Sequence, residues 1–94
     1  MSSLLRSYLD TQTMKQCGVV AQHSDVVEGI MSGFGMEVTK HNLNAVCLST
    51  KAFMDTDYMK SVNILKANNI KINKDTHLMI STIATRIHAR IAPR

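Results

Sequence analysis

Four histidines and two cysteines are the side chains of this 94-residue chain that could bind a transition metal or act as nucleophiles. They are His23, His41, His77, His88, Cys17 and Cys47. No two histidines lie three or four residues apart, so no helix would present a pair of them to a zinc ion. Neither cysteine belongs to a Cys-x-x-Cys pair, and the spacing gives no support to a Cys–His nucleophilic pair. The sequence therefore predicts no metal, no cofactor and no enzymatic activity.

The acidic pair Asp55 and Asp57 and the glycines of the first half are also poor candidates for a site. A calcium loop needs more oxygen ligands and a glycine between them, so Asp-x-Asp is better explained as the cap of a helix. Gly29, Gly33 and Gly35 do not have the spacing of a phosphate-binding loop that follows a strand. These residues are expected to mark the ends of helices.

Two isolated cysteines favour buried, reduced thiols, which predicts an intracellular, reducing compartment without excluding an organelle. A disulfide between them stays open, because the sequence alone gives no distance. The chain has no run of 18 apolar residues, so no membrane span is predicted. The first ten residues, MSSLLRSYLD, have too short an apolar segment for a signal peptide.

Positive charge is concentrated in the second half of the chain. Residues 1–57 have four Lys and Arg against six Asp and Glu, whereas residues 58–94 have seven against one. The candidate anion-binding residues are Lys60, Lys66, Lys71, Lys74, Arg86 and Arg90. Such asymmetry predicts an anionic partner, RNA or another polyanion. Cations near the end of a helix also complement its dipole, which would explain the two arginines but not the lysines.

The secondary-structure elements that position these residues are predicted to be helices, because apolar residues recur every three or four positions. Ser3 can cap a first helix, which Gly18 ends or interrupts. Ser24 can cap a second helix, which stops at Gly33 and Gly35. Thr39 can cap a third helix. Asp55 or Thr56 starts a fourth that ends at Asn68 and Asn69, and Asn73 caps a fifth that ends before Pro93. The short segments 36–38 and 70–72 are expected to be loops between helices.

The predicted inward faces follow the same spacing. They are Leu4, Leu5, Tyr8 and Leu9; Val26, Val27, Ile30, Met31 and Phe34; Leu43, Val46, Cys47, Phe53 and Met54; Tyr58, Met59, Val62 and Leu65; and Thr76, Ile80, Ile83, Ala84, Ile87 and Ile91. The fold class is therefore all-α, with about five helices in antiparallel hairpins. Residues 1–94 should form a single domain, a small bundle or a short helical solenoid.

The two loop segments, 36–38 and 70–72, correspond to each other in a weak repeat with a period of 34 residues. Gly35 corresponds to Asn69, Met36 to Ile70, and Val38 to Ile72. A helix end, a loop and the next helix start thus recur in register, although pairs such as Val27 and Ser61 do not match. A period near 34 is typical of stacked two-helix repeats.

With the stretches EGIMSGFGMEVTKHNLNAV and NILKANNIKINKDTHLMIS, the chain resembles the pentatricopeptide-repeat family over about residues 25–84. The family's loop proline is replaced by Val38 and Ile72, and its tyrosine by Leu43 and His77. The resemblance implies single-stranded RNA binding by helical hairpins, each reading about one base. The base-reading positions would then be Asn44 and Asn73.

Two functions follow as hypotheses. The first is a small non-enzymatic binding module that contacts RNA or another polyanion through residues 60–94. The alternative is a protein–protein interaction module, an adaptor, inhibitor or assembly subunit, that docks a partner or a second copy of itself. The seven methionines would provide the apolar docking surface of that module.

Overall fold

The computed structural model describes residues 11–92 of the chain. This part forms six helices, named here with their bounds: α2 (Thr11–Cys17), α3 (Val19–Gln22), α4 (Ser24–Gly33), α5 (Lys40–Met54), α6 (Tyr58–Ala67) and α7 (Lys74–Ile91). No strand occurs in the described residues, so the prediction of an all-α fold is confirmed. The helix face predicted at residues 4–9 and the cap at Ser3 lie outside the described residues.

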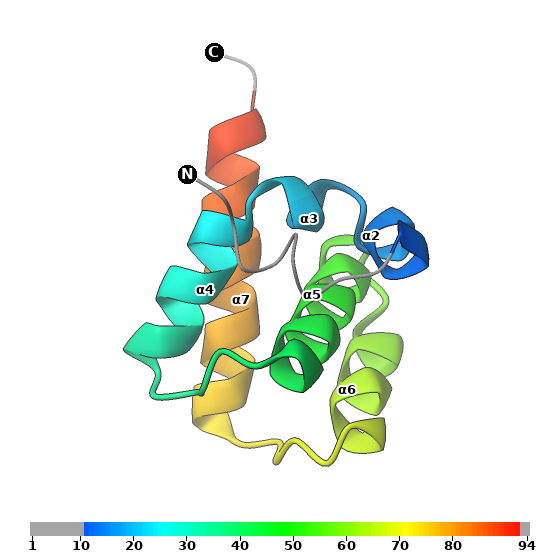
Figure 1. The fold of residues 1–94 in the computed structure, drawn as a ribbon, viewed down its shortest axis with the longest axis vertical. Coiled ribbons are helices and arrows are strands. Elements are labelled where there is room, and N and C mark those ends of the chain that lie inside the picture. Colours follow the sequence, from blue (N-terminus) through cyan, green and yellow to red (C-terminus); the bar gives the residue numbers. More distant parts are fainter. Residues whose placement is uncertain (1–10, 93–94) are drawn as a thin grey trace.

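Helix α5 is the centre of the molecule. It contacts each of the other described helices, and α4 and α7 lie side by side next to it (Figure 1). Thirteen buried apolar side chains form the core around it: Cys17, Val20, Ala21, Val27, Met31, Leu43, Val46, Cys47, Leu65, Met79, Ile80, Ile83 and Ile87. The principal extents of 32 × 29 × 26 Å are nearly equal, which describes a small bundle and not an extended solenoid.

The two loops that recur after 34 residues have the same backbone geometry. Gly35 has φ +79° and Asn69 has φ +60°, the left-handed conformation that ends many helices. The next residue then donates its N–H to the carbonyl five positions back, from Met36 to Met31 at 2.9 Å and from Ile70 to Leu65 at 3.0 Å. This pair of bonds closes α4 and α6 alike, and both segments are loops as predicted.

The start of the following helix is also equivalent. The Thr39 side chain accepts a hydrogen bond from the Asn42 N–H at 3.1 Å, and Asn73 accepts one from the Thr76 N–H at 2.9 Å. Both predicted N-caps are therefore confirmed. The shared geometry is a helix stop followed by a helix start, which the local sequence is enough to produce.

Helix α6 begins later in the sequence than predicted, and a different face of it is buried. Thr56 has φ +61°, and the Asp57 side chain accepts the hydrogen bond from the Lys60 N–H that caps the helix. Of the four residues predicted to face inward, only Leu65 is buried. Tyr58 is 55% and Met59 77% exposed, whereas Ser61 is buried. The predicted inward face of α6 was wrong, because the serine pair Ser49 and Ser61 makes a buried contact between α5 and α6 where apolar side chains were expected.

Smaller corrections concern the first half of the chain and two apolar ends. A break at Gly18, with φ +57°, is followed by the short helix α3, which the sequence did not predict. His23, not Ser24, occupies the cap position of α4. Phe34 and Ile91 were predicted to face inward but are 37% and 47% exposed, since each lies at the end of its helix.

The structure joins Cys17 of α2 to Cys47 of α5 in a disulfide, with Cα atoms 5.8 Å apart and both side chains fully buried. The sequence favoured reduced thiols, because thirty residues of separation say nothing about distance until α3 and α4 fold back onto α5. Such a bond does not fit the reducing compartment that was expected. Within residues 11–92, no helix is both long and apolar enough to cross a membrane.

Candidate functional site

An apolar groove separates α6 from α7 and has a volume of about 260 Å³. The end of α5, one face of α6, the connecting loop and the first turns of α7 surround it. The lining residues are Phe53, Tyr58, Ser61, Val62, Leu65, Ile72, Thr76, His77 and Ile80. Most of these side chains are apolar, so the groove suits an apolar guest.

The groove exists because α6 and α7 each pack on α5 and not closely on each other. The segment 68–73 that joins them is anchored at both ends. The His41 ring donates from Nε2 to the Asn68 carbonyl at 2.8 Å, and the Thr76 hydroxyl donates to the Lys71 carbonyl at 2.6 Å. These contacts fix the connecting segment to α5 and to the first turn of α7, and the groove is open in the folded chain.

Aromatic rings line the groove where α5 ends. The Phe53 ring meets Tyr58 edge to face with centroids 5.1 Å apart, and it meets His77 with centroids 6.2 Å apart. Tyr58 is 55% exposed beside them. Ile72, in the loop, is 38% exposed. Exposed aromatic side chains beside a pocket are typical of the central contacts of protein interfaces.

No lysine lines this groove, but three of the sequence-predicted cations are neighbours along the chain of residues that do. Lys66 lies one helical turn after Val62 on α6, and Lys74 lies one turn before His77 on α7, so each is next to a lining residue on its helix. Lys71 directly precedes Ile72 in the loop. All three lysines are exposed. The groove therefore has an apolar interior and lysines at its edge.

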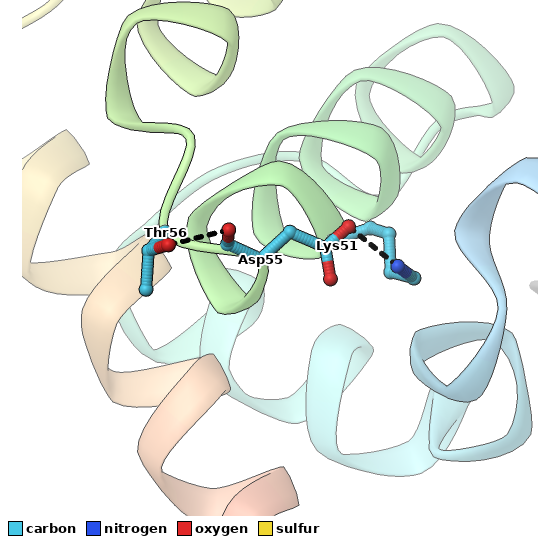
Figure 2. Close-up of polar contacts among 3 residues, drawn as sticks. All are labelled: Lys51, Asp55 and Thr56. Atoms are coloured by element: carbon cyan, nitrogen blue, oxygen red, sulfur yellow. Dashed lines mark hydrogen bonds and ion pairs between the residues drawn. The ribbon is translucent and has the colours of Figure 1, made fainter.

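Lys60 lies elsewhere, at a wider cavity of about 600 Å³ between α2, α5 and α6. Lys51, Asp55 and Asp57 border the same cavity. The Lys51 ammonium bonds the Asp55 carboxylate at 2.6 Å, and the Thr56 hydroxyl donates to the Asp55 carbonyl. Figure 2 shows both contacts as dashed lines. Charges of both signs neutralise each other here, so this cavity has no preference for an anion.

The arginines belong to a third surface, next to α4. Arg90 donates two hydrogen bonds to the Asp25 carboxylate, at 2.8 and 3.1 Å. The bonded guanidinium lowers the pKa of Asp25 below its usual value, because it favours the charged carboxylate. Arg86 lies one turn before Arg90 on the same face. The basic residues thus do not form one continuous surface.

The two asparagines lie in different surroundings. Asn73 uses its side-chain oxygen to cap α7. Asn44 lies in the second turn of α5, and its Oδ1 atom is buried without a hydrogen-bond partner among the described residues. Asn73 is exposed, whereas the oxygen of Asn44 does not reach solvent.

Sequence reasoning missed the groove itself. Tyr58 and Val62 were assigned to the core, and Phe53 and His77 were not connected with them. The signal that pointed to it is Ile72, an apolar residue in a loop between two helices. The methionines do not form the apolar surface, because Met59 is the one exposed methionine among the six in residues 11–92.

In residues 11–92 no three His, Cys, Asp or Glu side chains are grouped as metal ligands would be. Comparison with known proteins finds no family model, no curated protein and no solved structure that matches the chain. The function must therefore be argued from the groove and its surroundings.

Proposed function

We propose that this protein is a non-enzymatic protein-interaction module whose groove between α6 and α7 holds an amphipathic helix of a partner protein. The observation that supports this proposal is the open apolar groove of about 260 Å³ with exposed Tyr58 and Ile72 beside it. Apolar surface that stays open in a folded domain is a common mark of an interaction site. Binding a helix in a groove between two helices is a recurrent mode of recognition.

A helix is the favoured guest because it would complete the bundle. Helices pack with axes about 8–10 Å apart, and α6 and α7 are each packed on α5 while the space between them is open. A third helix in that space would cover Val62, Ile72 and His77 together. The lysines at the edge add a preference for a guest with carboxylates beside its apolar stripe.

Peptide selection from a random displayed library tests the proposal with defined probes. We expect enriched peptides with apolar residues spaced as on one helix face, and we expect Val62→Glu to weaken their binding by about tenfold or more, because it places a charge in an apolar site. Asn63→Glu is the matched control, since Asn63 is the exposed neighbour of Val62 on the same helix. Tyr58→Ala is a second groove variant that removes an exposed ring without touching the core.

Peptides that bind Val62→Glu and Tyr58→Ala as tightly as the native chain would contradict the proposal. Circular dichroism of each variant checks that the helices are retained. Light scattering tests a further outcome. Mass that rises with concentration, and falls in Val62→Glu, would show that a second copy of the chain occupies the groove and not a partner helix.

A second candidate, contact with RNA or another polyanion, is supported by the exposed cations. Lys60, Lys66, Lys71, Lys74 and Arg86 are all exposed, and within the described residues no carboxylate forms an ion pair with them. Phosphate contacts position a nucleic acid without reading its bases. The joint variant Lys71→Glu/Lys74→Glu should therefore weaken RNA of every sequence.

Filter binding at low and at physiological salt separates the two candidates. Phosphate contact weakens steeply as salt rises, whereas apolar docking does not. Asn73→Ala tests base reading, because loss of an exposed, uncharged amide would change the preferred base and leave the salt dependence intact. Asn44→Ala is the comparison, since the amide oxygen of Asn44 is buried. No measurable RNA affinity at low salt would exclude this candidate.

A further inference from the structure

The charges around the groove are concentrated at one of its two ends. The loop that connects α6 to α7 closes this end, and Lys66, Lys71 and Lys74 lie there, in the last turn of α6, in the loop and at the first position of α7. Asp75 is the one carboxylate between residues 66 and 77. The loop end of the groove therefore has an excess of positive charge.

The opposite end, where α6 begins, has no such excess. Asp55 is paired with Lys51, the contact drawn in Figure 2, at a distance of 2.6 Å between nitrogen and oxygen. Asp57 accepts the hydrogen bond from the Lys60 N–H at 3.2 Å that caps α6. Lys51, Asp55, Asp57 and Lys60 line the separate cavity between α2, α5 and α6, where their charges balance. They therefore add no net charge to the end of the groove that Phe53 and Tyr58 line. The groove has one basic end and one neutral, aromatic end.

We infer that the groove takes its partner helix in one direction, with an acidic C-terminal half at the loop between α6 and α7. This inference rests on the proposed function. Two effects act in the same sense. Carboxylates of the partner meet Lys66, Lys71 and Lys74, and the negative end of the partner helix's own dipole faces the same lysines. A helix in the reverse direction would bring its positive end to the basic end of the groove.

Two synthetic peptides of equal length and composition test the direction. Both have the same apolar stripe at helical spacing, and their glutamates lie either in the C-terminal half or in the N-terminal half. Each is titrated by fluorescence anisotropy against the native chain and against Lys66→Glu/Lys71→Glu/Lys74→Glu. Because glutamates near an N-terminus stabilise a free helix, the quantity compared is the ratio of the two dissociation constants on each protein, in which that difference cancels.

We expect the ratio of the two dissociation constants to favour the C-terminally acidic peptide about fivefold to tenfold more on the native chain than on the triple variant. Three partly screened charge contacts would produce a difference of this size. Lys60→Glu is the matched control, because Lys60 lies on α6 outside the groove, and it should leave the ratio unchanged. A paramagnetic label on the C-terminus of the bound peptide should broaden the amide signals of Lys71 and Lys74 more than that of Tyr58.

The outcomes separate the inference from the proposed function. Equal ratios on the native chain and the triple variant, or stronger broadening at Tyr58, would overturn the direction while the groove still binds peptides. Peptides whose affinity survives both Val62→Glu and Tyr58→Ala would instead overturn the groove as the binding site. A preference that persists unchanged at high salt would also count against the lysines, since exposed charge contacts are screened.

Discussion

Ser61 occupies the position on α6 that an apolar side chain would hold in an ordinary bundle. Its hydroxyl lies 2.7 Å from the Ser49 hydroxyl, and the Ser49 hydroxyl also lies 3.0 Å from the Ser61 carbonyl. Both serines are buried, so their polar groups satisfy each other away from water. Two small side chains let α5 and α6 approach closely, and this contact turns Tyr58 and Val62 toward the groove.

At this scale we predict that Ser49→Ala lowers the free energy of unfolding by about 1–3 kcal/mol, because it leaves polar groups of Ser61 buried without a partner. Urea denaturation followed by circular dichroism measures the change. Ser32→Ala is the control, since Ser32 is exposed. An equal, small effect of both substitutions would show that the serine pair does not hold α5 and α6 together.

Among the described helices, α7 is the longest, and its pattern is amphipathic. Met79, Ile80, Ile83, Ala84 and Ile87 are buried, and polar residues occupy most of the opposite face. The buried face packs on α5 and α4, while Thr76, His77 and Ile80 continue into the groove. The same helix therefore supports the core and forms one wall of the candidate site.

Ile80→Ala should lower the free energy of unfolding by about 2–5 kcal/mol, the cost of deleting buried methyl groups and leaving a cavity. Leu78→Ala is a matched control on the same helix, because Leu78 is 53% exposed, and it should change stability by less than about 0.5 kcal/mol. Thermal or urea unfolding of both variants provides the comparison. A loss of similar size in the two would mean that the inward face of α7 is assigned wrongly.

For the whole molecule, the Cys17–Cys47 disulfide is the one covalent link within residues 11–92 between segments distant in sequence. It ties α2 to the central helix α5, against which α2 also packs. A domain of 94 residues buries a modest share of its surface, so a crosslink contributes a large part of its net stability.

Loss of this disulfide should lower the free energy of unfolding by about 3–4 kcal/mol, the chain-entropy value for a loop of this length. Urea denaturation with and without reductant measures the difference, and Cys17→Ala/Cys47→Ala reports it without reductant present. If the urea midpoint is the same in all three cases, the bond does not contribute to stability. The single-residue changes proposed for the groove should be compared under one redox condition for this reason.

The sequence by itself determined most of the elements and several of their ends. Helical periodicity predicted α4, α5 and α7, and Thr39, Asn73, Gly35 and Asn69 marked starts and stops correctly, because capping depends on neighbours a few residues away. The excess of Lys and Arg over Asp and Glu in residues 58–94 likewise indicated the candidate lysines.

Only the tertiary structure decided which faces are buried and which residues meet. It turned Tyr58 and Met59 outward, since Ser49 and Ser61 take the contact between α5 and α6. It also separated Lys60 and Arg90 from the groove and joined Cys17 to Cys47. These outcomes depend on packing between segments far apart in the chain, which a local pattern of apolar residues does not encode.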